Sequence, residues 1–367
     1  MADFVLRAIG ICLLAVLAAC SGRKEQPKPF ELKAVPVYKM PGWASDDVSE
    51  ALPALLKSCE NPKPDWREFC RGLNPKASSK KLRRYLEKNL DAYLVLANGS
   101  QEGTFTGYYE ASLNGSFVRE GAYQTPIYGV PADLVRVDLN TFGVKSDKTQ
   151  LIGRVENGKL VPYFKRIDSE QMQAPVLLWV DDPVDSFILH IQGSGRVETP
   201  DGVVHVGYAG NNGHGFVGIG SIMAKAGVLE PGKASMPHIR TWLKENPEQA
   251  KALMAQNPRF IFFQILPQAD GPIGAAGVSL TPRRSIAVDT RFIPLNTPVF
   301  LNTTDPDGEK IQRLVVAQDI GAAIKGPVRA DFFWGYGEEA FQKAGRMKSV
   351  GSYYLLWPKG KTPPGSL

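Results

Sequence analysis

The stretch Leu314–Gly335, LVVAQDIGAAIKGPVRADFFWG, decides how the rest of the chain is interpreted. Its first apolar run is typical of a buried strand, and that run gives way to a small-residue loop at Asp319. A second apolar run, Phe332–Trp334, begins directly after Asp331. Two carboxylates therefore stand at the ends of two predicted neighbouring strands.

A third carboxylate, Asp289, follows the apolar run Ser285–Val288 in the same position at a strand end. Carboxylates at strand ends beside an aromatic residue such as Trp334 are what general acid/base chemistry on a sugar would need. The alternative is that each Asp only caps a turn, which is the commoner role of this residue at a strand end. The pattern alone leaves both interpretations open.

Composition indicates a globular, β-rich protein. The 367 residues are 43% hydrophobic and 22% charged, and they include 36 Gly and 28 Pro, which favours many turns over a helical bundle. The formal net charge of +6 suits an acidic polymer or an anionic membrane surface. No cluster of basic and aromatic residues typical of nucleic-acid binding is present, so no nucleic-acid partner is expected.

The N-terminus has the pattern of an export signal. Arg7 precedes the apolar run Ala8–Ala19, which is too short to span a bilayer and is typical of a signal peptide. The run ends in Leu-Ala-Ala followed by Cys20, which resembles a bacterial lipobox. The alternative is an ordinary signal peptide with an incidental Cys.

Lipidation of Cys20 would place the protein on a membrane. Ser21 follows the Cys rather than Asp, and the resemblance then points to the outer membrane, facing the periplasm. Acyl chains, each contributing about 0.8 kcal/mol per buried methylene, would hold the domain there. Residues 1–19 are the predicted signal peptide, and the polar, Pro- and Lys-rich residues 20–37 are a predicted lipidated tether.

The remaining cysteines of the processed chain are Cys59 and Cys70, eleven positions apart. A lone pair in an oxidising compartment predicts a disulfide that closes a small loop. The alternative is that the two cysteines form half of a zinc site, but no His lies near them in the sequence. The sequence shows no cluster of metal ligands elsewhere, so no metal or cofactor is expected.

Helices are expected over Ser45–Leu56, Ser79–Leu96, Ile222–Val228, Met236–Glu245 and Glu338–Lys343, with short strands between them. Among the predicted strands are Thr104–Glu110, Thr125–Tyr128, Val176–Val180, Ser186–Gln192, Val203–Tyr208, Arg259–Leu266, Ser285–Asp289, Val299–Asn302, Gln312–Gln318, Asp331–Trp334 and Tyr353–Trp357. The last six of these predicted strands, from Arg259 to Trp357, suggest a small closed barrel.

Two glycine-containing motifs partly match known functional motifs, one for dinucleotide binding and one for serine hydrolases, but neither match is complete. Gly213–Gly218 matches GxGxxG but lacks a surrounding βαβ pattern. A nucleophile elbow at Ser194 would need Gly where Gln192 stands. His190 lies in an apolar run, where a His is more often a satisfied core residue than a base.

Neutral polar and aromatic residues gather at other strand ends, where they could pair with sugar hydroxyls and stack on sugar rings. Ordinary turn chemistry is an equally good explanation for them. They are Gln192, Ser194, Tyr208, Asn211 and Asn212.

Several motifs together resemble one family, that of the membrane-bound lytic murein transglycosylases A, whose C-terminal part is named for three aspartates. They are GYYEA at 107–111, HIQGSG at 190–195, VGYAGNNGH at 206–214, NPRFIFFQ at 257–264, AVDTRFIPLNTPVF at 287–300 and AQDIGAAIKGPVRADFFWG at 317–335. The resemblance covers nearly the whole mature chain.

This resemblance implies a mainly β fold with a double-psi β-barrel domain and a groove beside it. The barrel domain would combine a helical part, residues 38–104, with a strand-rich part, residues 236–360. A second β-rich domain, residues 105–235, would be inserted between them, and a glycan strand would lie in the groove between the two domains.

The resemblance also assigns residues. The catalytic acid would be Asp331, with Asp319 as its close partner and Asp289 in support. Ala322 departs from the family pattern, which commonly has a second Gly there. The residues expected to bind substrate are Tyr108, Tyr109, Gln192, Ser194, Gly195, Tyr208, Asn212, Lys325 and Trp334.

The implied reaction cleaves the β-1,4 bond between N-acetylmuramic acid and N-acetylglucosamine in peptidoglycan and leaves a 1,6-anhydromuramic end. One Asp can act as acid and then as base, because the attacking hydroxyl belongs to the substrate itself.

Cell-wall synthesis or division proteins are candidate partners. The alternatives are a peptidoglycan-binding lipoprotein without catalysis and a hydrolytic glycosidase with two flanking carboxylates.

Overall fold

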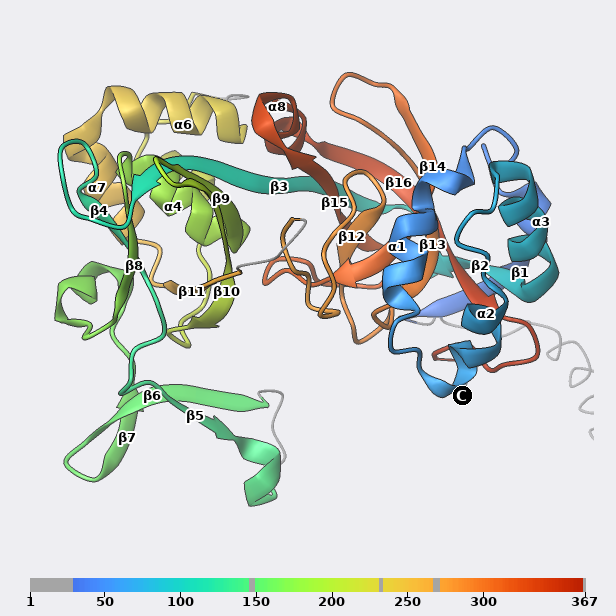
Figure 1. The fold of residues 1–367 in the computed structure, drawn as a ribbon, viewed down its shortest axis with the longest axis horizontal. Coiled ribbons are helices and arrows are strands. Elements are labelled where there is room, and N and C mark those ends of the chain that lie inside the picture. Colours follow the sequence, from blue (N-terminus) through green and yellow to red (C-terminus); the bar gives the residue numbers. More distant parts are fainter. Residues whose placement is uncertain (1–28, 145–148, 231–233, 267–270, 366–367) are drawn as a thin grey trace, which may run out of the picture.

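The computed structural model describes residues 29–144, 149–230, 234–266 and 271–365. They form two lobes that are joined by one long strand, β3 (Gly103–Ser116), which runs across the middle of Figure 1. The predicted mainly β fold with a second β-rich domain is confirmed. The predicted signal peptide and Cys20 lie outside the described residues. Within the described ranges, no helix is both long and apolar enough to cross a membrane.

The first lobe is a closed six-stranded barrel. Its ring runs β3–β16–β13–β14–β12–β15 and returns to β3, with the pairs β12–β14 and β15–β3 parallel and the others antiparallel. Closure removes the free sheet edges that an open barrel sheet would expose. The barrel strands besides β3 are β12 (Ser285–Val288), β13 (Thr297–Thr304), β14 (Lys310–Asp319), β15 (Arg329–Tyr336) and β16 (Lys348–Pro358).

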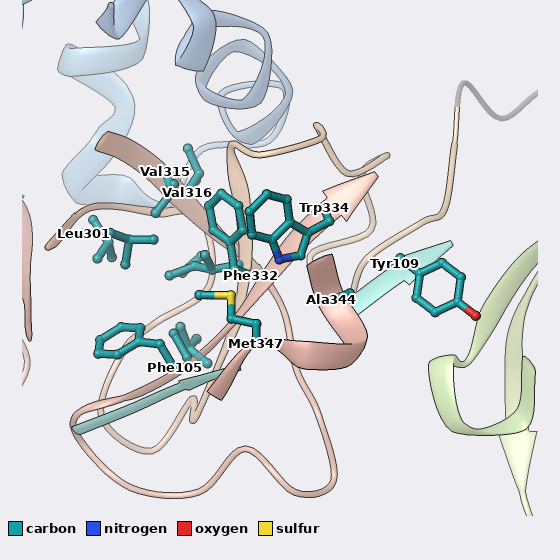
Figure 2. Close-up of a cluster of buried hydrophobic side chains, with 14 of the residues drawn as sticks. Phe105, Tyr109, Leu301, Val315, Val316, Phe332, Trp334, Ala344 and Met347 are labelled. Carbon is teal, nitrogen blue, oxygen red and sulfur yellow. The ribbon is translucent and has the colours of Figure 1, made fainter. Parts of the chain in front are cut away.

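Alternation along the strands fixes which side chains fill the barrel. Phe105 and Phe332 are each 1% exposed and belong to the hydrophobic cluster in Figure 2, together with Leu301 and Met347. Because successive side chains on a strand point to opposite faces, the residues next to the two phenylalanines face away from this core. The outer face of β3 and β15 therefore carries polar residues directly beside a rigid core.

The N-terminal segment extends and covers the barrel. β2 (Leu90–Leu96) pairs with β16, and β1 (Glu31–Val35) pairs with β2, so the last part of the predicted tether is an edge strand. The helices of this segment are α1 (Leu52–Ser58), α2 (Arg67–Gly72) and α3 (Ser79–Asn89). A disulfide joins Cys59 to Cys70, as the sequence predicts, and ties the end of α1 to α2.

Two helix predictions for this segment were partly wrong. The predicted helix Ser79–Leu96 ends at Asn89, because the following residues have strand-like alternation and find partners on both sides. The predicted helix Ser45–Leu56 is a 3₁₀ turn, η2 (Val48–Ala51), followed by α1. Pro53 at the start of α1 suits the first turn of a helix rather than a helix interior.

A buried ion pair fixes η2 on the barrel. The Arg284 side chain is 4% exposed, and its guanidinium donates to both carboxylate oxygens of Asp46 at 3.0 and 3.1 Å and to Glu50 at 2.6 Å. The Asp46 carboxylate also accepts from the backbone N–H of Leu314 at 2.7 Å. These hydrogen bonds offset part of the cost of burying the charges, while Arg284 Nε has no partner among the described residues.

The second lobe combines a mixed sheet with four helices and a projecting arm, the three-stranded sheet at the lower left of Figure 1. Its strands are β4 (Thr125–Tyr128), β8 (Val176–Val180), β9 (Ser194–Thr199), β10 (Gly202–Asn211) and β11 (Ile261–Ile265), with β5 (Val135–Asp138), β6 (Gln150–Glu156) and β7 (Lys159–Pro162) in the arm. Its helices are α4 (Pro183–Gln192), α5 (Ile219–Lys225), α6 (Met236–Glu245) and α7 (Pro247–Ala255).

The predicted strand Ser186–Gln192 was wrong, because these residues form most of α4. Asp182 caps this helix by accepting from the backbone N–H groups of Val184 and Asp185, and Pro183 occupies its first turn. Gly193, with φ +82°, ends it in a left-handed conformation. These start and stop signals outweigh the apolar character of the run.

The boundary expected between residues 104 and 105 falls inside β3. The first half of this strand pairs with β15 and β16 in the barrel, whereas Ala111–Asn114 pair with β9 and Gly115–Ser116 with β8 in the second lobe. The last helix, α8 (Gly337–Arg346), follows β15 and precedes β16 in the chain. It packs on β3 near the middle of the molecule (Figure 1).

Candidate active site

Strand register places Asp319 and Asp331 on neighbouring strands of the barrel. Both residues pair with Ala287, Asp319 from β14 and Asp331 from β15, so that β12 alone lies between them. A spacing of about 4.8 Å between adjacent strands puts their backbones roughly 10 Å apart. The pair predicted from the sequence is thus brought together on one face of the barrel.

The Thr106 hydroxyl links the carboxyl group of Asp331 to Arg329. Arg329 Nη2 donates to Thr106 Oγ1 at 2.8 Å, and Thr106 Oγ1 is 2.5 Å from Asp331 Oδ1. A guanidinium can only donate, so Thr106 accepts from Arg329. The Thr106 hydroxyl in turn donates its own proton to Oδ1 of Asp331. A proton carried by the Asp331 carboxyl therefore belongs on Oδ2, the oxygen that has no partner among the described residues.

Burial favours the protonated form of both carboxyl groups. Protein atoms surround them closely although each side chain keeps some contact with solvent. Burial raises the pKa of Asp331, while the hydrogen bond from Thr106 and the charge of Arg329 oppose this rise. Burial also raises the pKa of Asp319 to about 6, and the nearby charge of Asp331 contributes to this.

Two further groups define the surroundings of Asp319. Its Oδ1 accepts from the backbone N–H of Ala275 at 3.0 Å, which joins the loop before β12 to the end of β14. Tyr108 lies two residues beyond Thr106 on the same face of β3, and its buried hydroxyl has no partner of good geometry in the described chain. Burial, and then the charges of Asp319 and Asp331, raise the pKa of Tyr108 well above its usual value.

The structure places Asp289 in a supporting position. Its side chain is 3% exposed, forms an ion pair with Arg291 at 2.6 Å and accepts from the backbone N–H of Gly326 at 2.8 Å. Although burial opposes it, these hydrogen bonds hold the pKa of Asp289 at about 2. A group that stays ionised in this way can hold the loop containing Lys325 but cannot serve as an acid near neutral pH.

Some residues expected to bind substrate are structural. The amide of Asn212 is fully buried and satisfied, since it donates to the carbonyls of Phe164 and Pro258 and accepts from the backbone N–H of Phe260. Gly195 permits close packing of β9, because a Cβ there would lie 2.5 Å from Leu189 and 2.9 Å from the carbonyl of Ala111.

Two aromatic residues expected at the substrate also belong to the core. Trp334 is 7% exposed and packs against Phe332, with ring centroids 5.0 Å apart (Figure 2). Tyr109 is 8% exposed and packs against Phe341 of α8 at 5.4 Å. Both rings are largely buried, and their assignment to substrate binding stays a prediction.

The other expected substrate-binding residues are accessible. Tyr208 is 48% exposed and Lys325 is exposed, while Ser194 and Gln192 are half-buried where α4 and β9 approach β3. Gln192 Oε1 accepts from the backbone N–H of Tyr109 at 3.2 Å. No group of three or more His, Cys, Asp or Glu suited to a metal ion occurs in the part of the chain that the structure describes.

Sequence reasoning missed Thr106 and Arg329. The contact between Thr106 and Asp331 spans 225 positions and depends on the parallel register of β3 and β15, which no local pattern reveals. The alternating run TFTGYYE gave a strand but no sign of what its outer face meets. His190, expected in the core, is 7% exposed and accepts from the backbone N–H of Ile261.

The fold and site define a class of protein: a β-barrel with an inserted lobe and a recessed carboxyl pair suited to acid/base chemistry. The model of the MltA specific insert domain matches residues 104–264, and the model of the 3D domain matches residues 284–357. The matched insert ends later than the expected boundary at residue 235.

Individual proteins agree with these matches. The membrane-bound lytic murein transglycosylase A of Escherichia coli K12 is 32% identical over 275 residues, which are 71% of this chain and 66% of that relative. The crystal structure of MltA from Neisseria gonorrhoeae is 35% identical with a TM-score of 0.81, covering 92% of this chain and 96% of that one. E. coli MltA with bound chitohexaose is 27% identical with a TM-score of 0.62, covering 92% and 95%.

The chain belongs to the membrane-bound lytic murein transglycosylase A family. Its curated relatives are named as membrane-bound lytic murein transglycosylases A, which are enzymes. The region matched to the E. coli relative spans about two thirds of that protein's length.

Proposed function

We propose that the protein is a lytic transglycosylase that cleaves the β-1,4 bond between N-acetylmuramic acid and N-acetylglucosamine in peptidoglycan and forms 1,6-anhydromuramic ends. Family membership supports the substrate class. The observation that carries the chemistry is the directed hydrogen-bond chain from Arg329 through Thr106 to Asp331, because it leaves Oδ2 of a carboxyl group free to deliver a proton.

Asp331 acts first as an acid. Its Oδ2 proton passes to the glycosidic oxygen as the bond to C1 of the muramic residue breaks. The Asp331 carboxylate then takes the proton of the C6 hydroxyl of the same sugar, whose oxygen bonds to C1. The proton count balances without water, and the enzyme returns to its starting state. A single acid/base suffices because the nucleophile is already part of the substrate.

Asp319 adjusts the charge around Asp331, and the buried Tyr108 hydroxyl stays neutral beside the pair. The raised pKa values of both aspartates mean that the pair binds a proton more readily than two free carboxyl groups would. When Asp331 is ionised after the first step, a protonated Asp319 limits repulsion between the two. Asp289 holds the neighbouring loop through Gly326.

The proposed membrane anchor follows from the sequence pattern at the N-terminus. Cys20 is the proposed lipidation site, and the anchor would hold both lobes at the periplasmic side of the outer membrane. The glycan is proposed to lie between the lobes, where Gln192, Ser194 and Tyr208 are accessible. Cell-wall synthesis or division proteins are the proposed protein partners.

Mass spectrometry of products from purified sacculi tests this function. Soluble protein beginning at Ser21 should release anhydromuropeptides, and Asp331→Asn should release none, because an amide carries no transferable acidic proton. Asp65→Asn, at an exposed position away from the carboxyl pair, is the matched control and should retain activity.

Other products would contradict the proposal in different ways. Reducing-end muropeptides would show hydrolysis and would exclude the single-acid mechanism. Binding to sacculi without any product from wild type would favour a non-catalytic peptidoglycan-binding lipoprotein. Full activity in Asp331→Asn would move the acid to another carboxyl group.

A further inference from the structure

A second polar cluster lies on the face of β3 that carries the candidate active site. Thr106, Tyr108, Glu110 and Ser112 alternate along this strand and therefore share one face. Register extends the face sideways, since Glu110 pairs with Tyr336 of β15, and Ser112 pairs with Arg196 of β9, which pairs in turn with His205 of β10. Paired residues point to the same side of a sheet.

Glu110 holds His205 in place. Glu110 is 1% exposed, and one of its oxygens lies 2.9 Å from His205 Nδ1. The His205 side chain is 20% exposed, so its other ring nitrogen remains available to a ligand. The buried carboxylate is itself out of reach of a ligand and fixes the orientation of the imidazole, as second partners of functional histidines commonly do.

Arg196 has an unusual shortage of partners. Its guanidinium stacks over the ring of Tyr336 at 4.6 Å, and Tyr336 is 60% exposed. Its charge acts on the buried Glu110 carboxyl group and lowers the pKa of that group, although burial raises it more strongly. Within the described residues Arg196 makes no close ion pair and no side-chain hydrogen bond, and its Nε is buried without a partner. A half-buried guanidinium with its donors unused is suited to a planar acceptor such as a carboxylate.

We propose that Arg196 and His205, with Tyr336 as a stacking platform, form a subsite for a carboxylate on the peptide substituent of the glycan. This inference rests on the proposed function for the identity of the polymer. The subsite lies six residues along β3 from Thr106, which at about 3.3 Å per residue is roughly 20 Å from the reacting carboxyl group. It would recognise substituted glycan away from the cleaved bond.

The subsite would distinguish carboxylate-bearing glycan from neutral glycan. Arg196 can form two parallel hydrogen bonds to a carboxylate, which a neutral amide matches poorly. The positive charge should therefore lower KM for peptide-substituted strands and leave kcat nearly unchanged, because it acts on bound substrate and transition state alike.

Co-sedimentation with purified sacculi tests the subsite directly. Native sacculi are compared with sacculi whose carboxylates have been converted to amides. We expect Arg196→Gln to bind native sacculi about tenfold more weakly than wild type, the loss of one charge-assisted interaction, and amidated sacculi equally well. Arg196→Lys should recover part of the loss, since it keeps the charge without the planar fork.

Arg119→Gln is the matched control. Arg119 also stacks on an aromatic ring of the second lobe, that of Trp179 at 5.1 Å, but it donates to Gln124 and is exposed. Its loss should change neither binding measurement. Equal binding by wild type and Arg196→Gln on native sacculi, or equal weakening on both kinds of sacculi, would overturn the proposal.

Cleavage is scored separately from binding. If wild type yields no anhydromuropeptides, the proposed reaction fails, yet the comparison of native with amidated sacculi still decides the subsite. If cleavage occurs and Arg196→Gln shows no binding difference, the reaction stands and the subsite is wrong. Melting temperatures of all variants identify unfolding, and Arg196→Lys supplies the comparison if the Gln variant unfolds.

Discussion

At the scale of single residues, the position of a proton decides what the candidate site can do. The Thr106 hydroxyl accepts from Arg329 and donates to Oδ1 of Asp331. This arrangement assigns different roles to the two oxygens of one carboxyl group. A site in which Thr106 could rotate freely would offer Asp331 no such distinction.

Thr106→Val tests this role at nearly constant side-chain volume. Removing the hydrogen bond removes a stabilisation of the Asp331 carboxylate, so its pKa should rise further and the alkaline limb of the kcat profile should move to higher pH. Loss of alignment should lower kcat by about tenfold or more. Kinetics on soluble glycan strands across pH measure both effects.

Thr106→Ser is the matched control, because it keeps the hydroxyl and should keep the wild-type pH profile. An unchanged profile in Thr106→Val would show that this hydrogen bond does not govern Asp331.

Asp319→Asn should stabilise the folded protein at neutral pH. The pKa of Asp319 is raised from 3.8 to about 6 on folding, so its contribution favours folding below pH 3.8 and is lost as the pH rises through 6. Replacing the costly charge with an amide should raise the free energy of unfolding by on the order of 1 kcal/mol at pH 7.5, with little change at pH 4.

Urea unfolding at the two pH values measures this difference. The amide can still accept from the backbone N–H of Ala275, so the substitution changes mainly the charge. Destabilisation at both pH values would mean that Asp319 is not a buried, energetically costly carboxylate.

At the scale of elements, the short helices of the N-terminal segment depend on tertiary links. α1 and α2 contain seven and six residues, and isolated helices of this length are unstable in water. The Cys59–Cys70 disulfide and the Arg284–Asp46 ion pair join this segment to itself and to the barrel. These links supply what helix propensity does not.

Replacing both cysteines with serine should lower stability without altering the site. Closing a loop of this length restricts the unfolded chain by about 3 kcal/mol in the chain-entropy model. We therefore expect a lower melting temperature for Cys59→Ser/Cys70→Ser, with kcat within about twofold of wild type because neither cysteine makes a hydrogen bond to the carboxyl pair. Calorimetry under oxidising conditions measures the first effect.

Reduced wild type is the companion measurement for this variant. If reduced wild type and the double variant both melt at the temperature of the oxidised protein, the disulfide does not stabilise the fold. A selective loss of kcat would instead connect the segment to the site.

At the scale of the whole molecule, local patterns predicted the strands well and the long-range contacts poorly. The strand Ser285–Val288 was recognised because the apolar residues Ile286–Val288 directly precede the polar Asp289. The α4 segment was misassigned because its apolar run outweighed the cap at Asp182. Both outcomes follow from information within about ten residues.

The residues of the candidate site lie far apart in the sequence, so local patterns could not show that they meet. Asp319 and Asp331 could be paired from a family motif, whereas Thr106 comes from a strand 225 positions away. Asn212 and Trp334 resembled sugar-binding residues by type, yet each is needed inside the protein, one to satisfy backbone carbonyls and the other to fill the core. Residue type alone cannot distinguish a sugar-binding role from a structural role, because the distinction depends on whether the side chain is buried.

The course of β3 through both lobes also affects the thermodynamics of binding. Lobes connected by loops can close on a ligand and lose conformational entropy as they do so. Here the connection is a strand whose barrel partners end at Glu110 and whose second-lobe partners begin at Ala111, so each half is stiffened by its own ladder and any rotation between the lobes would concentrate at that junction. A long polymer in contact with both lobes would therefore meet two surfaces of fixed shape, and the entropy that the protein loses on binding would come from their relative orientation.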